Sequence, residues 1–130
     1  MITIDIIADA KFPFDRAALR AHLIKVLARH RLTDNVVVEV QVVGARKMTQ
    51  LHVDFMQLPG PTDVLSFPLN DQKDDRPFVA SPDGMLRLGA IVVCYPVAVE
   101  EALEKQIKVD DQIQFLAEHG LMHLLGFHHE

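Results

Sequence analysis

A run of β-branched residues between positions 35 and 43 constrains the fold more than any other feature of this chain. Six of these nine residues are valine, and only Asn35, Glu39 and Gln41 are polar. β-Branched side chains pack well on a pleated surface, and a nearly continuous apolar run is typical of a strand inside a sheet. The sequence therefore predicts a buried strand here.

Apolar periodicity places further elements on both sides of this strand. Ile2, Ile4 and Ile6 alternate with polar residues, which predicts a half-buried first strand. Asp15 is suited to cap a helix on which four apolar residues recur at helical spacing: Leu19, Leu23, Val26 and Leu27. Similar patterns predict strands at 63–69 and 86–95 and helices at 45–57, 96–108 and 110–125.

Because strands and helices alternate, the predicted fold class is α/β (α+β). We expect a single domain, residues 1–130, in which about four helices pack on a mixed, mostly four-stranded sheet. Residues 70–84 are rich in acids and amides and have few large apolar side chains, so they are expected to form a mobile loop.

Composition narrows the class of protein. The chain has 130 residues, a net charge of −5 and one cysteine, Cys94. A lone cysteine allows no internal disulfide, and no apolar run reaches the roughly 18 residues that span a bilayer. We therefore expect a cytoplasmic protein with no membrane and no disulfide partner. The negative charge argues against broad, non-specific nucleic-acid binding, and the basic residues gathered in 16–31 are expected on the solvated face of a helix.

Four of the seven histidines lie in the last twelve residues. On a helix four residues advance by about 400°, so His119 and His123 project from nearly the same face, about 6 Å apart along the axis. Gly126 suits the left-handed position that ends a helix. The chain can then turn back, so that His128 or His129 supplies a third ligand. This pattern predicts a divalent metal site, with zinc the expected ion.

The spacing H-x-x-x-H-x-x-G-x-x-H is also the ligand skeleton of the metzincin proteases. Those enzymes carry a general-base glutamate directly after the first histidine, where this chain has Gly120. A protease is therefore disfavoured. Three imidazole ligands leave a fourth position for a zinc-bound water, as in catalytic zinc sites. The remaining histidines (His22, His30 and His52) are expected to be structural or solvent-facing, and His128 and Glu130 to be exposed.

Two long motifs give the chain a family resemblance. Its ending, H-G-L-M-H-L-L-G-F-H-H, resembles the signature H-G-x-L-H-L-x-G-Y-D-H of the YbeY-type bacterial rRNA maturation factors. Residues 61–68, P-T-D-V-L-S-F-P, match the other hallmark of that family, as does Leu88-Gly89 at the start of an apolar strand. The resemblance implies a zinc-dependent, single-strand-specific endoribonuclease acting in small-subunit (16S) rRNA maturation and ribosome quality control.

The same resemblance implies particular site residues and partners. One Zn²⁺ per chain would be held by His119, His123 and His129. The strand around Ser66 and Phe67 would form a wall of the metal cleft, together with Met56, which stands where relatives carry an arginine. The implied partners are single-stranded or ribosomal RNA and the small ribosomal subunit.

Two departures from the family pattern keep a second class of function open. Met56 cannot make the bidentate phosphate contact of an arginine, and Ala90 stands where relatives carry an acid. No side chain stands out as a general base. The favoured function is the zinc-dependent endoribonuclease. The alternative is a catalytically weakened, zinc-containing RNA- or ribosome-associated binding protein, and a zinc protease comes third because of Gly120.

Overall fold

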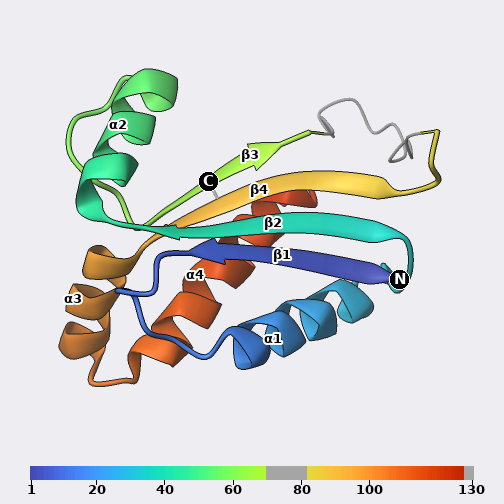
Figure 1. Ribbon diagram of the computed structural model, residues 1–130, viewed down its shortest axis with the longest axis horizontal. Helices are drawn as coiled ribbons and strands as arrows, with labels where there is room; N and C mark the ends of the chain where they lie inside the picture. The colour runs from blue at the N-terminus through green and yellow to red at the C-terminus, as the bar shows by residue number, and fades with distance from the viewer. Residues whose placement is uncertain (70–81, 128–130) are drawn as a thin grey trace.

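The structure is a computed structural model that describes residues 1–69 and 82–127. These residues form one four-stranded sheet in the order β1-β2-β4-β3 (Figure 1). Strands β1 (Ile2–Ala8), β2 (Val36–Val43) and β4 (Leu86–Cys94) are parallel, whereas β3 (Val64–Pro68) pairs antiparallel with β4 at one edge. The described helices are α1 (Arg16–Arg29), α2 (Ala45–Met56), α3 (Tyr95–Lys105) and α4 (Val109–Leu124).

This arrangement confirms the predicted α/β domain with a mixed four-stranded sheet and four helices, and the element boundaries differ from the prediction by a few residues. Asp15 caps α1 as expected, because its carboxylate accepts a hydrogen bond from the backbone N–H of Ala18 at 2.9 Å. The basic residues of 16–31 are exposed, which confirms a solvated helix face.

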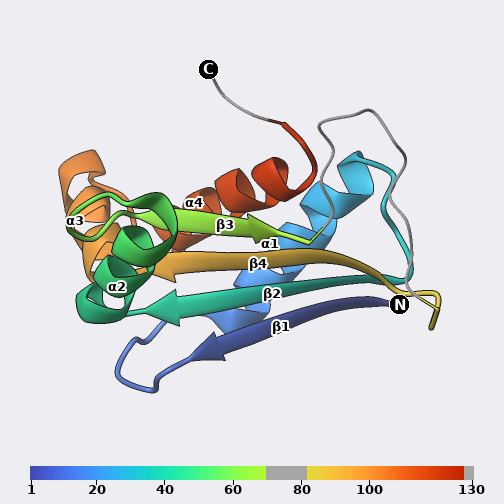
Figure 2. The same cartoon turned by 90° about the horizontal axis from the view of Figure 1, so that it is seen from above.

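Helices α1 and α4 cover one face of the sheet. The side chains of β2 that point to this face are at most 2% exposed: Val36, Val38, Val40 and Val42. They pack with buried residues of both helices, including Leu23 and Leu121. Figure 2 looks onto the opposite face and shows both helices behind the strands. This layer holds most of the apolar core.

On the opposite face, α2 packs on the sheet and covers only one end, where Val97 of α3 joins it (Figure 2). Its fully buried Met48 packs against Val92 and Cys94. The β2 side chains on this side, from Val37 to Val43, are only half-buried. The predicted burial of the valine run is therefore confirmed on one face and partial on the other, because a single helix cannot cover four strands.

Within the described residues, no helix is long and apolar enough to cross a membrane. Most of the loop expected at 70–84 lies outside the described residues, so its mobility stays a prediction.

Candidate metal centre

Helix α4 brings His119 and His123 together. The centroids of the two imidazole rings lie 4.5 Å apart and the ring planes are inclined by 54°. Both side chains are half-buried, and the Nε2 nitrogen of His123 is shielded from solvent. Two imidazoles one helical turn apart on the same side are the arrangement that the spacing predicted.

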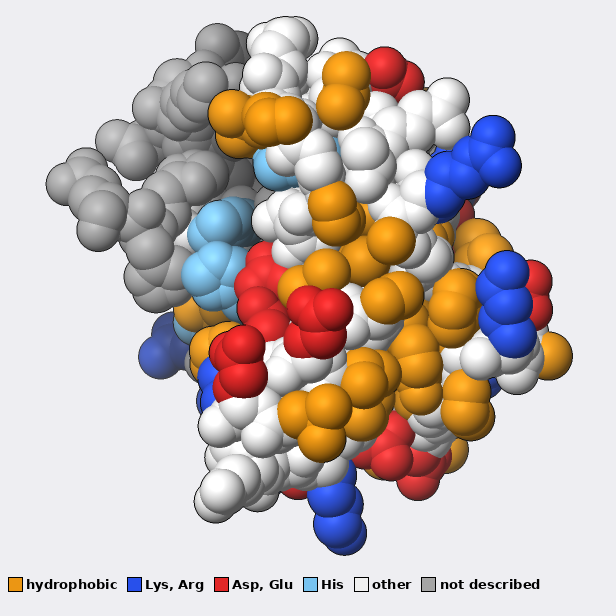
Figure 3. Space-filling model, turned by 90° about the vertical axis from the view of Figure 1, so that its left-hand side faces the viewer, with side chains coloured by type: hydrophobic (Ala, Val, Ile, Leu, Met, Phe, Trp, Pro, Cys, Tyr) orange, Lys and Arg blue, Asp and Glu red, His pale blue; other side chains and the backbone are white. Residues whose placement is uncertain are grey.

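The pair faces away from α1 and toward the edge strand. Glu118 reaches across to α1, where its carboxylate lies 2.8 Å from Nε2 of His22. Because successive helical residues turn by about 100°, His119 and His123 lie on the other flank of α4, on the side of β3. Figure 3 shows histidine side chains at the surface with acidic side chains directly beside them.

Gly120 has a packing role that explains why no glutamate follows the first histidine. A Cβ atom at this position would lie 2.6 Å from Cγ2 of Ile91 and 3.4 Å from Cγ2 of Val64. Glycine therefore lets α4 approach β4 and β3 closely. Position 120 faces the sheet, so a larger side chain there would be forced into the core.

The end of α4 matches the expected glycine stop. Gly126 has a φ of 94°, and its N–H donates to the carbonyl of His123 at 3.0 Å. The N–H of Phe127 donates to the carbonyl of Met122 at 2.9 Å. These two bonds form a Schellman motif, which ends the helix and sends the chain off in a new direction.

The donor set suits zinc as far as the structure describes it. Zinc accepts histidine nitrogen at about 2.0–2.1 Å, and two imidazoles one turn apart can share one ion. Within residues 1–69 and 82–127 there is no group of three or more potential metal-ligating side chains. The third expected ligand, His129, lies outside the described residues together with His128 and Glu130.

The structure separates two residues that were expected on one wall of the cleft. Successive residues of a strand point to opposite faces of the sheet. Val64 contacts the α4 side, since it lies close to Gly120, so Ser66 also points to that side. Phe67 points to the α2 side, where its ring packs edge-on against Phe55 with 5.3 Å between centroids. Of Ser66 and Phe67, only Ser66 shares a face of the sheet with the histidine-bearing helix.

The two positions that depart from the family pattern also lie away from α4. Met56 is the last residue of α2 and is 52% exposed, so a charged side chain there would reach water. Ala90 pairs with Phe67 and lines a cavity of about 360 Å³ on the open face of the sheet.

The remaining histidines have structural contacts, as expected. His22 pairs with Glu118, and the Nδ1 atom of His52 lies 2.9 Å from the carbonyl oxygen of Gly60. His30 follows α1, and its ring lies 5.2 Å from that of Phe127.

The sequence did not predict that the carboxyl groups of Glu101 and Asp63 form a pair. Burial raises the pKa of Glu101, and a hydrogen bond with Asp63 raises it further. The side-chain amide of Gln112, a buried residue of α4, donates a hydrogen bond to the carboxylate of Glu101 at 2.9 Å. Asp63 belongs to the P-T-D-V-L-S-F-P motif, but no periodicity could pair it with a residue of a distant helix.

Comparison with known proteins identifies relatives across the chain. Residues 7–130 match the family model described as endoribonuclease YbeY. A relative of that name from Streptomyces coelicolor is 37% identical and covers 99% of this chain and 79% of its own. Another relative of that name, from Thermobifida fusca, is 35% identical, and the match covers 98% of this chain and 81% of the relative. A solution structure of TM1509 from Thermotoga maritima superposes with a TM-score of 0.62 at 27% identity, covering 100% of this chain and 75% of that one.

The fold, the histidine pair and these relatives together define a metal-dependent hydrolase built on a single α/β domain. The chain belongs to the endoribonuclease YbeY family, which confirms the resemblance carried by its two motifs.

Proposed function

We propose that this protein is a zinc-dependent, single-strand-specific endoribonuclease that acts on ribosomal RNA in small-subunit maturation and ribosome quality control. The observation that carries this proposal is the imidazole pair of His119 and His123, 4.5 Å apart, in a chain of this family. The relatives' name, endoribonuclease, supports the reaction class. The proposed partners are single-stranded or ribosomal RNA and the small ribosomal subunit, and the proposed location is the cytoplasm.

The ion would be held by His119, His123 and His129, one per chain. When bound, zinc acts as a Lewis acid and activates water for attack on phosphorus. The chain's own contribution is rigidity, because α4 is anchored in the core through Leu121 and Leu124 and so fixes the spacing of its histidines. Ser66 offers a hydroxyl on the same face of the sheet.

The alternative function is a weakened enzyme that chiefly binds RNA or the ribosome. It is favoured by Met56, which lacks the phosphate-binding group expected at that position, and by Ala90, which lacks the acid. A protease is disfavoured further, because Gly120 contacts Ile91 and leaves no room for a general base.

A cleavage assay tests the proposal. The substrates are a single-stranded oligoribonucleotide, its duplex form and a 16S rRNA fragment, each incubated with zinc-loaded and with chelated protein. We expect internal cleavage of the single strand and the rRNA fragment with zinc only, and little cleavage of the duplex. His119→Ala should abolish cleavage, whereas the matched control His52→Ala, which changes a histidine on α2, should retain it.

Equal cleavage by chelated protein, or by His119→Ala, would rule out the zinc-dependent nuclease. RNA binding without cleavage by zinc-loaded protein would instead favour the alternative. Co-sedimentation with isolated small subunits tests the ribosomal partner.

A further inference from the structure

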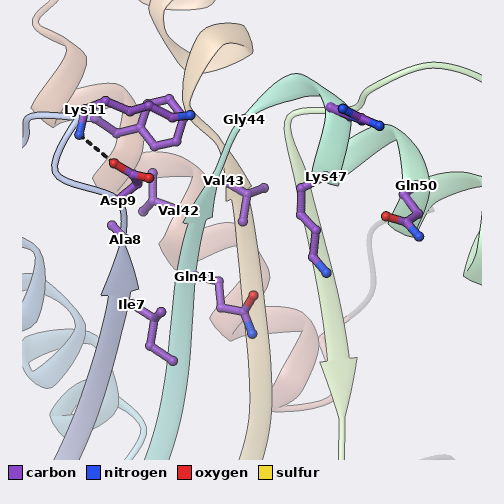
Figure 4. A pocket seen from close by; sticks show the side chains of 12 residues that line it. Ile7, Ala8, Asp9, Lys11, Gln41, Val42, Val43, Gly44, Lys47 and Gln50 are labelled. Carbon is purple, nitrogen blue, oxygen red and sulfur yellow. Dashed lines mark hydrogen bonds between the residues drawn. The ribbon is translucent and has the colours of Figure 1, made fainter.

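At its α2 end, the face of the sheet that α1 and α4 leave open carries two adjoining cavities. The larger, about 490 Å³, lies where β1 and β2 end and α2 begins (Figure 4). Its walls come from the last residues of β1, from Gln41 to Val43 of β2, and from the first turns of α2. In open α/β sheets, ligands bind at the carboxyl ends of parallel strands, which is the place of this cavity.

Three cationic side chains line this cavity: Lys11, Arg46 and Lys47. All three are exposed, and none forms an ion pair with another residue in the described part of the chain. Asp9 is the one acid among the lining residues, and its carboxylate accepts a hydrogen bond from the backbone N–H of Lys11 at 3.0 Å. In a chain of net charge −5, this is a local positive surface suited to an anion.

The smaller cavity, about 200 Å³, shares Lys47 and Gln41 with the larger one, so the two adjoin. Its walls include Phe55 of α2 and Phe67 of β3, whose rings pack edge-on at an interplanar angle of 74°. Phe55 is 60% exposed although it is aromatic. Exposed aromatic rings beside a cationic groove are the hallmark of sites that stack the bases of single-stranded nucleic acids.

Together the cavities cross the sheet from β1 to β3, along the end that α2 covers. Asp5, Glu39 and Arg87 line the neighbouring cavity farther along the open face, and the guanidinium of Arg87 is paired with the carboxylate of Asp83. The two carboxylates of Asp5 and Glu39 leave this cavity less favourable for a phosphodiester chain than the α2 end. A polyanion is therefore favoured at the α2 end, where three cations face one acid. The two adjoining cavities end at β3, and this strand also packs against the histidine-bearing helix.

We infer that single-stranded RNA binds across the α2 end of the open sheet face, with its phosphates on Lys11, Arg46 and Lys47 and a base stacked against Phe55 and Phe67. This inference rests on the proposed function, because it takes RNA as the substrate. It adds a binding surface that lies on the opposite side of the sheet from α4, at residues outside the metal-ligand motif.

The test measures binding without cleavage. Fluorescence anisotropy with a labelled single-stranded oligouridylate is recorded in excess chelator at several salt concentrations. Lys47→Met and Arg46→Met should each weaken binding and lower the slope of log affinity against log salt by about 0.7. Phe55→Ala should weaken binding roughly 5- to 150-fold and leave that slope unchanged. Loss of a cation should therefore lower both the affinity and the salt slope, whereas loss of the Phe55 ring should lower the affinity alone.

Matched controls lie on the other side of the molecule. Lys25→Met removes an exposed lysine of α1, and Phe115→Ala removes a 55% exposed phenylalanine of α4. Both should bind as the unaltered protein does. The inference is overturned if the controls weaken binding as much as the test variants, if Lys47→Met and Phe55→Ala bind normally, or if the unaltered protein does not bind.

The same variants separate this inference from the proposed function. Normal binding by the α2-face variants, in a protein that cleaves RNA with zinc, overturns the surface and leaves the nuclease standing. The expected losses of binding, in a protein that never cleaves, overturn the nuclease and leave the RNA-binding surface.

Discussion

The two faces of the sheet differ in almost every physical respect. On the face covered by α1 and α4, Val38, Val40 and Ile91 are fully buried and pack in one continuous core. On the other face, a single helix covers one end, and the half-buried strand residues include Glu39 and Gln41. The covered face carries the stability of the domain, and its outer edge carries the histidines. The open face offers cavities and charged side chains to a ligand.

This difference would let a small domain accommodate both the proposed metal site, which is rigid, and the proposed binding surface, which is adaptable. A metal site needs ligands whose positions are fixed by packing, which α4 obtains from the core. A surface for a flexible polyanion needs exposed cations and rings instead, and the cations would destabilise a buried layer. Substitutions on the two faces should therefore have different consequences.

The largest expected effect is at the metal site. His123→Ala should lower zinc affinity by orders of magnitude, because a three-ligand site has no redundancy once one ligand is removed. His52→Ala, on the open-face helix α2, should leave zinc binding unchanged. Elemental analysis of the purified proteins measures both. Full zinc occupancy in His123→Ala would contradict the assignment of this helix as the metal site.

The second-largest expected effect concerns how tightly the two faces of the sheet are packed. Leu121→Ala should lower the free energy of unfolding by about 2–5 kcal/mol, because Leu121 is 0% exposed in the core of the covered face. Val53→Ala on α2 removes a side chain that is 47% exposed, so its effect should stay within about 0.5 kcal/mol. Urea denaturation monitored by circular dichroism gives both values. Similar losses for the two variants would show that the open face is as well packed as the covered one.

The same contrast explains which features the sequence could predict. Local patterns determine the elements of the covered face: the valine alternation of β2, the Asp15 cap and the Gly126 stop all act over a few residues. The fold class, the histidine pair and the end of α4 followed from such patterns and are confirmed.

Features that depend on contacts between distant segments could not be predicted in this way. The pairing of Glu101 with Asp63 and the close approach of Gly120 to Ile91 arise only when α3, α4 and the sheet come together. Ser66 and Phe67 were expected on one wall, yet the pleat of β3 sends them to opposite faces. The cavities of the open face likewise join β1, β2 and α2, which no sequence period links.

A smaller effect is expected from placing on α2 the arginine that the family resemblance implies. Met56→Arg should raise RNA cleavage about tenfold to a hundredfold, because a charge-assisted phosphate contact contributes roughly 1.5–3 kcal/mol. The slope of log RNA affinity against log salt concentration should steepen by about 0.7 for a single-stranded substrate. The exposed position lets the guanidinium reach water, so the fold should tolerate the change.

Leu58→Arg is the control for that gain. It adds the same charge two residues farther on, at a side chain that is 49% exposed. Cleavage rates measured across a salt series should rise for Met56→Arg and change little for Leu58→Arg. An equal rise would indicate general attraction of RNA, and no rise in a folded, zinc-loaded Met56→Arg protein would favour the RNA-binding alternative.

The smallest expected effect concerns charge on the covered side. Burial and the hydrogen bond with Asp63 raise the pKa of Glu101. A carboxyl whose pKa is raised by folding stabilises the fold fully below its unfolded pKa, and that contribution is lost as pH rises through its folded pKa. Ionisation of Glu101 in the folded protein therefore opposes folding at a pH above its unfolded pKa. Glu101→Gln should raise the free energy of unfolding at neutral pH by less than about 1 kcal/mol, since a partly exposed carboxylate is screened by solvent.

The pH dependence distinguishes this charge effect from a simple change in packing. Glutamine keeps an oxygen that can accept the hydrogen bond from Gln112, so the contact between α3 and α4 is retained. The advantage of Glu101→Gln, measured by urea denaturation at several pH values, should shrink as pH falls through the pKa of Glu101, because the carboxyl of the unaltered protein then becomes neutral as well. Lys47→Met on the open face should change stability little at any of these pH values, since its ammonium group is already in water. An advantage that stays constant with pH would mean that Glu101 acts through packing. In that case, the effect of removing a charge on stability would not differ between the covered side and the open side.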